Sequence, residues 1–223
     1  MPKKIDQKIV DCTVVPKKAD EDATQLEADI VYMHEKISRP ESLLGSTYKV
    51  KTPLSDHALY ITINDIILNP DTKHEQRRPF EIFINSKSMD HFQWVVALTR
   101  VISAVFRKGG DTTFLVEELK GVFDPKGGYF KRGGRFMPSL VAEIGEAIED
   151  HMKVIGLIPE DKLDAHQKAF LDKKKQELAG NDGESIESDF PASAQLCSKC
   201  QTKALVFSDG CMTCLSCGDS KCG

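Results

Sequence analysis

The residues with the clearest chemistry are cysteines, and six of the seven in the chain lie in residues 196–223, LCSKCQTKALVFSDGCMTCLSCGDSKCG. Their spacing is C-x2-C-x10-C-x2-C-x2-C-x4-C. Two C-x2-C turns separated by a short hairpin, with a strand-like ALVF and an Asp-Gly turn, predict a zinc ribbon. A tetrahedral zinc site uses four thiolates, so two of the six sulfurs remain for another purpose.

The second half of the ligand set is ambiguous, because three cysteines form overlapping C-x2-C pairs. Only the last pair is followed by a glycine, Gly218, where the turn readily takes a left-handed conformation. The preferred zinc ligands are therefore Cys197, Cys200, Cys214 and Cys217, which leaves Cys211 and Cys222 as the surplus pair. The alternative set ends in Cys211 and Cys214 and leaves Cys217 and Cys222.

Cys222 is surplus in both assignments. We expect it to be accessible near the end of the chain, and Lys221 beside it would favour a thiolate suited to thiol–disulfide exchange. Zinc has no redox chemistry, so any electron transfer must use the surplus sulfurs. The competing interpretation is that Cys211 and Cys222 are idle or redundant ligands. The seventh cysteine, Cys12, is interpreted as a small half-buried hydrophobe.

Composition restricts the classes of function. The net charge of −4 and the pI of about 5.9 do not favour binding to nucleic acid. The sequence shows no signal-peptide pattern and no run of about 20 apolar residues, so we expect a cytoplasmic protein without a membrane span. In a reducing compartment, clustered cysteines are metal ligands or working thiols more often than permanent disulfides.

The rest of the chain predicts an α+β fold, with short antiparallel strands packed with three or four helices, followed by the small C-terminal zinc ribbon. Strands are expected at 57–68 and 79–85, and helices at 89–108, 113–123, 138–155 and 161–180. In the first helix, the predicted buried stripe is Phe92, Val95, Val96, Ile102, Val105 and Phe106. In the third, it is Leu140, Val141, Ile144, Ile148, Met152 and Ile155.

Four regions follow from this pattern. Residues 1–38 hold a strand-like segment at 8–15 and a charged connector, and residues 39–156 form the α+β domain. Residues 157–195 hold a helix and a flexible linker, which would let the tail move, and residues 196–223 form the zinc ribbon.

The α+β domain shows no catalytic motif. Its paired carboxylates, such as Glu149-Asp150, are interpreted as solvated charges on helices. The segment KGGYFKRGGRF, residues 126–136, mixes basic and aromatic residues as single-strand nucleic-acid contacts do, but it equally suits a mobile surface loop or a partner-docking loop.

Several segments together resemble the C-terminal part of the adenosylcobalamin-dependent, class II ribonucleotide reductases, including their TSCPD domain. They are RPESLLGSTYKVKTP (39–53), YITIND (60–65), RPFEIFINSKS (78–88) and the cysteine tail. The Thr-Ser-Cys-Pro-Asp signature itself is missing, and FMPSLVAEIGEAIE (136–149) stands in its place, so no role of that cysteine is transferred. The chain also has no room for the catalytic barrel of the family.

The resemblance implies a split enzyme. This chain would be the accessory subunit of a ribonucleoside-diphosphate reductase, and a separate large catalytic subunit would bind adenosylcobalamin. Cys211 and Cys222 would relay electrons from a thioredoxin-like or other protein reductant to the disulfide formed in the large subunit at each turnover. The alternative function is a zinc-ribbon adaptor that binds nucleic acid or a polymerase.

Overall fold

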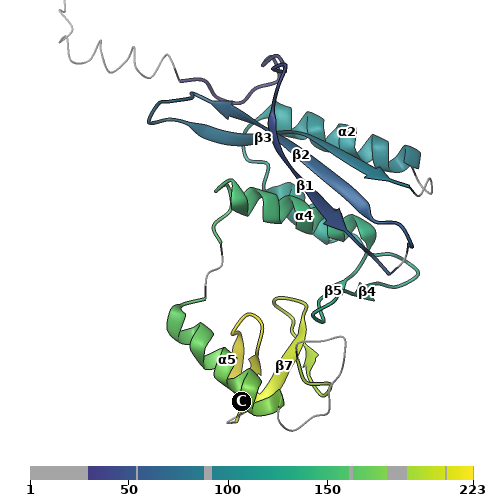
Figure 1. Ribbon diagram of the computed structural model, residues 1–223, viewed down its shortest axis with the longest axis vertical. Coiled ribbons are helices and arrows are strands. Elements are labelled where there is room, and N and C mark those ends of the chain that lie inside the picture. The colour runs from purple at the N-terminus through teal and green to yellow at the C-terminus, as the bar shows by residue number, and fades with distance from the viewer. Residues whose placement is uncertain are drawn as a thin grey trace, which may run out of the picture.

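The computed structural model describes residues 30–53, 55–87, 92–160, 163–179, 190–208 and 210–222. The expected strand at 8–15 with Cys12, the charged connector and most of the expected linker lie outside these residues. The described part consists of a larger body, from residue 30 to residue 160, and a smaller tail, from residue 163 to residue 222 (Figure 1).

The body is built on a three-stranded antiparallel sheet in the order β1-β2-β3. Its strands are β1 (Leu44–Val50), β2 (Leu59–Leu68) and β3 (Gln76–Ser86). The alternation of apolar residues sends Ile61 and Ile63 of β2, and Ile82 of β3, to the same buried face. A bulge between Asn64 and Asp65 interrupts the pairing of β2 with β3. The two strands predicted from sequence are confirmed, and β1 is an additional strand.

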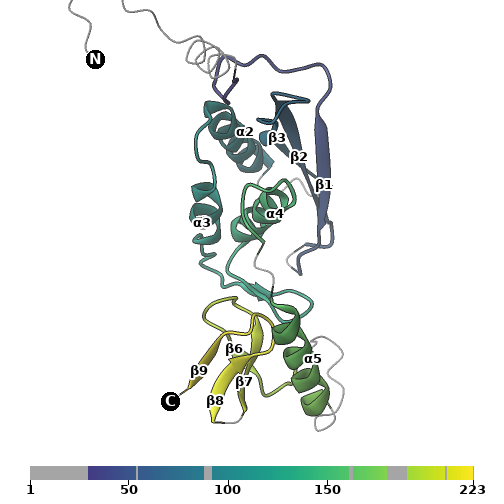
Figure 2. The ribbon, with the colours of Figure 1, turned by 90° about the vertical axis from the view of Figure 1, so that its left-hand side faces the viewer.

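The helices cover one face of this sheet, as Figure 2 shows. They are α2 (Phe92–Lys108), α3 (Phe114–Lys120) and α4 (Leu140–Val154). Helix α2 packs on β3, α4 packs against β1 and β2, and α3 packs on α4. A short hairpin, β4 (Tyr129–Phe130) and β5 (Phe136–Met137), connects α3 to α4.

The buried stripes were predicted correctly in part. In α2, Ile102 and Phe106 are buried, but Phe92 and Val96 are exposed, so their predicted burial is wrong. The physical reason is that α2 packs mainly on β3, and none of the described residues forms a layer over its outer side. In α4, Ile144, Ile148 and Met152 are buried as predicted, while Leu140, Val141 and Ile155 are half-buried.

The tail combines one helix with a four-stranded antiparallel sheet in the order β6-β7-β8-β9. The helix is α5 (Ala165–Ala179), and the strands are β6 (Gln195–Leu196), β7 (Lys203–Ser208), β8 (Cys211–Cys214) and β9 (Ser220–Cys222). The hairpin predicted from ALVF and the Asp-Gly turn is the β7–β8 hairpin. The described residues therefore form an α+β protein with four helices and a C-terminal cysteine cluster, as the sequence predicted.

Candidate metal centre and disulfide

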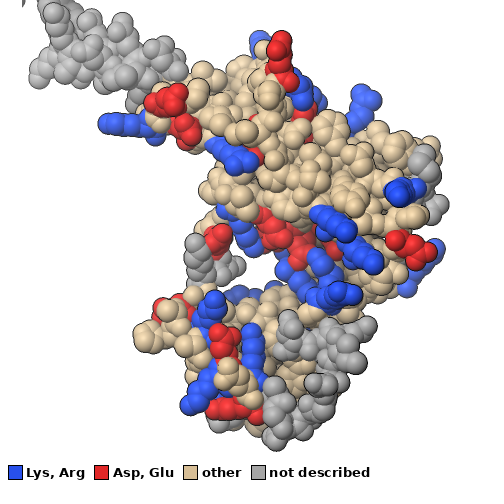
Figure 3. Space-filling view, in the orientation of Figure 1, with Lys and Arg blue, Asp and Glu red and all other residues tan. Residues whose placement is uncertain are grey.

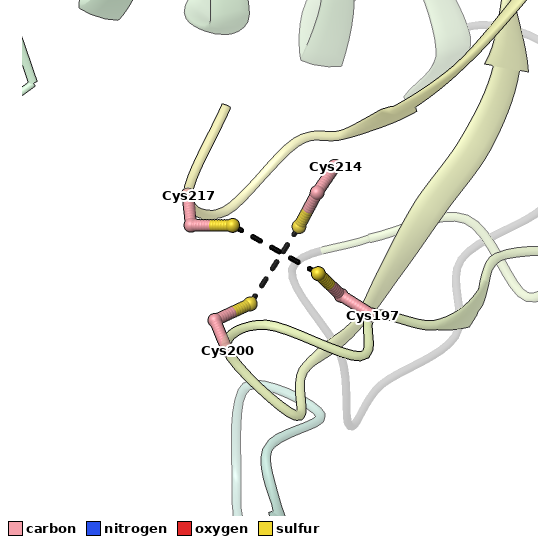
Figure 4. Close-up of side chains that lie close together, drawn as sticks. All are labelled: Cys197, Cys200, Cys214 and Cys217. Atoms are coloured by element: carbon pink, nitrogen blue, oxygen red, sulfur yellow. Dashed lines mark hydrogen bonds between the residues drawn. The ribbon is translucent and has the colours of Figure 1, made fainter. Parts of the chain in front are cut away.

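Four cysteine sulfurs of the tail converge on one point (Figure 4). The sulfurs of Cys197 and Cys217 lie 3.9 Å apart, those of Cys200 and Cys214 lie 3.6 Å apart, and all four lie within 4.8 Å of one another. Zinc–sulfur bonds of about 2.3 Å in a tetrahedron place the sulfurs about 3.8 Å apart. The donor set and its spacing therefore fit a metal ion such as zinc.

Two turns of the same geometry present these sulfurs. In the first turn the carbonyl of Cys197 accepts a 2.9 Å hydrogen bond from the amide of Gln201, and in the second the carbonyl of Cys214 accepts one of 2.9 Å from Gly218. The residue that donates this hydrogen bond has a left-handed backbone conformation in both turns, with φ of 54° at Gln201 and 74° at Gly218. The sequence signalled the second turn through its glycine. It did not signal the first, where glutamine takes the left-handed position.

Burial raises the pKa values of the clustered thiols, whereas hydrogen bonds donated by Thr202 lower that of Cys200. Burial raises the pKa of Cys214 and of Cys217. Burial also opposes ionisation of Cys200, but hydrogen bonds from the hydroxyl and amide of Thr202 lower its pKa to about 7. Four thiolates at this separation repel one another, so a divalent cation is the natural means of holding all four in the deprotonated form.

The two remaining cysteines form a disulfide between adjacent strands. Cys211 opens β8 and Cys222 is its register partner on β9, with their Cα atoms 4.2 Å apart. The side chain of Cys211 is half-buried, whereas Cys222 and the rest of β9 are exposed. The bonded pair is thus accessible from the outer edge of the tail sheet.

All six cysteines singled out from the sequence are therefore placed in two groups. The structure gathers Cys197, Cys200, Cys214 and Cys217 in one cluster and joins Cys211 to Cys222. The alternative set, with Cys211 as a ligand and Cys217 as a surplus thiol, does not correspond to this grouping. The roles of metal ligand and electron carrier remain predictions.

The body contains a buried polar chain that sequence reasoning missed. His151 is fully buried, its Nε2 lies 2.8 Å from Oδ1 of Asp65, and its Nδ1 lies 2.9 Å from the hydroxyl of Tyr48. Arg77 completes the chain with a 2.8 Å ion pair to Asp65. Burial also raises the pKa of Tyr48. These contacts link β1, β2, β3 and α4. The imidazole of His151 has no exposed surface and is therefore not accessible to a substrate.

The basic loop is held by carboxylates of α4. Lys131 lies 3.2 Å from Glu143 and 2.7 Å from Glu146, and Arg135 lies 2.6 Å from Glu146. Both glutamates are buried, at 2% and 5% exposure, and the hydroxyl of Tyr129 donates to Glu143. Figure 3 shows charged side chains gathered on the side of the body that faces the tail. The sequence offered no sign that these glutamates are buried.

The same loop joins the body to the tail. The amide of Phe136 donates a 2.7 Å hydrogen bond to the carbonyl of Gln201, and the amide of Lys203 donates one of 2.7 Å to the carbonyl of Gly134. Arg135 and Thr202 form an isolated β-bridge between these bonds. Gln201 is the left-handed residue of the first cysteine turn, so the body contacts a turn that supports the cluster of four cysteines.

Residues 126–136 contact the tail of the same chain, which differs from the mobile, partner-docking and nucleic-acid interpretations. Lys131 and Arg135 face carboxylates, and their charges are paired within the chain.

Within the described helices, none combines the length and apolar character needed to cross a bilayer.

One comparison with known proteins gives a match. The family model of the TSCPD domain matches residues 31–152, which is more than half of the chain and covers the sheet with α2, α3 and most of α4. No curated protein and no solved structure matches the chain significantly. The matched region stops before α5 and the cysteine tail.

Proposed function

Because the chain belongs to the TSCPD domain family, we propose that it is the accessory subunit of a split ribonucleoside-diphosphate reductase. The TSCPD domain is found in class II, adenosylcobalamin-dependent ribonucleotide reductases. A separate large subunit would bind the cobalamin and the ribonucleotide and carry out the radical chemistry. This chain would supply the dithiol that reduces the large subunit's active-site disulfide after each turnover.

The division of the tail cysteines into two groups is the observation that carries this proposal. A cluster of four thiols that binds a metal would give the tail a fixed shape, while the accessible Cys211–Cys222 pair would change its oxidation state. Since the pair lies outside the cluster, it can be oxidised and reduced without loss of a metal ligand. We propose zinc as the metal, because it is itself redox-inactive.

The electron transfer is a thiol–disulfide exchange. In the reduced tail, the thiolate of Cys222 attacks one sulfur of the large subunit's disulfide and forms a mixed disulfide, and the other sulfur leaves as a thiolate that takes up a proton. The thiolate of Cys211 then attacks Cys222. The large subunit regains its dithiol, and the tail ends as the Cys211–Cys222 disulfide, which an external dithiol reduces again.

The test uses the full chain combined with the large subunit, adenosylcobalamin and a ribonucleoside diphosphate, with a thioredoxin as reductant. Cys222→Ser should give a burst of about one deoxyribonucleotide per active site and then arrest, because the dithiol relay is broken. Dithiothreitol, which can reach the active site directly, should restore turnover. Continued cycling of this variant with thioredoxin would refute the relay.

The matched control is Cys12→Ser, which removes the one thiol outside the tail and should cycle normally. Metal analysis of Cys222→Ser should still give about one zinc per chain, because this residue lies outside the cluster of four. If the chain yields no deoxyribonucleotide with any large subunit and retains a nucleic-acid or polymerase partner, the adaptor function takes the place of this proposal.

A further inference from the structure

A groove lies between α5 and the tail sheet, directly beside the disulfide. Its volume is about 260 Å³, and Cys211 forms part of its wall. The floor is apolar, with Leu171 of α5, Val206 of β7 and Leu215 after β8 all buried. Phe170 lies at its rim and is 53% exposed.

Strand register explains why the disulfide borders this groove. Ser208 pairs with Cys211, and Val206 pairs with Thr213, so these four side chains lie on one face of the β7–β8 hairpin. Ser220 on β9 pairs with Thr213 and extends the same face. Helix α5 contributes Phe170, Leu171 and Lys174 to the groove above this face, and Cys211 lies in the same lining.

One basic side chain, Lys174, lines the groove. This lysine of α5 donates a 2.5 Å hydrogen bond to the hydroxyl of Ser208. Its ammonium group also lies 5.6 Å from the centre of the Phe170 ring. Helix α5 has four lysines and two acidic residues, and Lys221 stands next to Cys222 on β9. Blue side chains along α5 are visible in Figure 3.

We propose that this groove is the docking site for the protein that reduces the Cys211–Cys222 disulfide. The partner would be a dithiol protein whose reactive thiol stands in an apolar surface bordered by acidic residues. The apolar floor fits the surface around such a thiol, and the charge of Lys174 attracts the acidic border. This inference deepens the proposed function and rests on its redox role for the pair.

The placement of the two sulfurs sets the direction of the exchange. Cys211 lies at the groove and Cys222 lies on the exposed outer strand, so the docked thiolate attacks the sulfur of Cys211. The bond between the two cysteines breaks, and Cys222 leaves as a thiolate that water solvates and protonates. The partner's second thiolate then attacks the partner sulfur bound to Cys211 and releases a second thiolate, which also takes up a proton. The partner ends as a disulfide and the tail as a dithiol.

The test measures how fast the oxidised, metal-loaded full chain is reduced by a thioredoxin, and separately by dithiothreitol. Phe170→Ala and Lys174→Glu should each lower kcat/KM for the thioredoxin roughly tenfold, which is the size of effect expected for a residue that contributes strongly to binding. The rate with dithiothreitol should not change. With the unmodified chain, the rate with thioredoxin should also fall as salt is added.

Each variant has a control on the same element or the same sheet. Lys173→Glu makes the same charge change beside Lys174, but Lys173 is 77% exposed and does not line the groove. Phe207→Ala removes an aromatic ring that is 71% exposed on the opposite face of β7. Both controls should react as the unmodified chain does. Because Phe170 is half exposed, Phe170→Ala should keep the metal. This variant therefore tests the docking site even if Lys174→Glu disturbs the tail.

A thioredoxin lacking its second cysteine should be trapped on Cys211, which peptide mass analysis after rapid acid quenching would identify. Trapping on Cys222, or unchanged kcat/KM in Phe170→Ala, would overturn the docking site. A parallel loss of the rates with both reductants would overturn it as well, because that result indicates a general disturbance. None of these measurements uses the large subunit or ribonucleotides, so a failure of the proposed reductase role would be seen separately.

Discussion

The body and the tail hold their shapes by different means. The body buries a continuous set of large aliphatic and aromatic side chains between its sheet and α2, α3 and α4, with Phe106 and Ile148 almost fully enclosed. The buried cluster of the tail is smaller and includes Cys197 and Cys214 among its members. Small folds bury too little apolar surface for independent stability and use metals or disulfides instead. We therefore expect the tail, unlike the body, to depend on its cysteines for stability.

Removal of the metal should have the largest effect. Structural zinc contributes about 10–16 kcal/mol of apparent binding free energy in zinc-finger peptides, and this free energy is linked to folding. Cys214→Ser, or chelation, should reduce the metal content from about one per chain to none and abolish hydrogen-exchange protection in β7 and β8. The circular dichroism of the body helices should persist. Cys211→Ser is the control and should retain the metal. A cooperative loss of most helical signal would show that body and tail fold as one unit.

Truncation of a side chain in the body core should destabilise the body and leave the tail unchanged, the reverse of metal removal. Ile148→Ala removes a fully buried side chain, and such a change lowers the free energy of unfolding by about 2–5 kcal/mol. Thermal or denaturant unfolding measures the loss, and the metal content should not change. Val154→Ala lies on the same helix at 65% exposure and should cost less than about 0.5 kcal/mol. Loss of metal in Ile148→Ala would mean that the tail requires the body.

The contact between the two regions can be weakened through one glutamate. Glu146→Gln removes the charge that holds Lys131 and Arg135, and loss of hydrogen bonds to charged groups costs about 1.5–3 kcal/mol. Hydrogen exchange should rise at residues 131–136 and 201–203, where the loop meets the cysteine turn. Exposed Glu118 on α3 provides a matched control as Glu118→Gln. Unchanged exchange at 201–203 would show that the ion pairs do not support the contact.

The smallest effect concerns an ion pair at the edge of the body sheet. The hydrogen bond and charge of Arg39 lower the pKa of Glu81, although burial opposes this. A carboxylate whose folded pKa is depressed stabilises the fold above its unfolded pKa, and this contribution is lost as the pH falls through the folded value. Glu81→Gln should therefore lower Tm by about 2–4 °C at pH 7, and the difference should shrink below about pH 4. A difference that is independent of pH would contradict this role.

The sequence by itself predicted β2, β3, the helices and the cysteine cluster of the tail. Two patterns are local: the alternating apolar residues of β2 and β3, and the helical spacing of Ile144, Ile148 and Met152. A local pattern can be read from the sequence because it depends on the geometry of one element alone. The two C-x2-C turns are equally local, and Gly218 marked one of them because its backbone angle excludes most other residues. These features predicted an α+β fold with a metal-binding cysteine cluster.

Only the tertiary structure decided which residues far apart in the sequence meet. His151 lies 86 residues from Asp65, and nothing near either residue signals their 2.8 Å contact. The partner of Cys222 depends on the register of β8 with β9, and the exposure of Phe92 and Val96 depends on the absence of a layer outside α2 in the described residues. The attachment of the basic loop to Gln201 likewise requires the body and tail to be in place. Periodicity records which side of an element is apolar, but the neighbours of that side are set by packing.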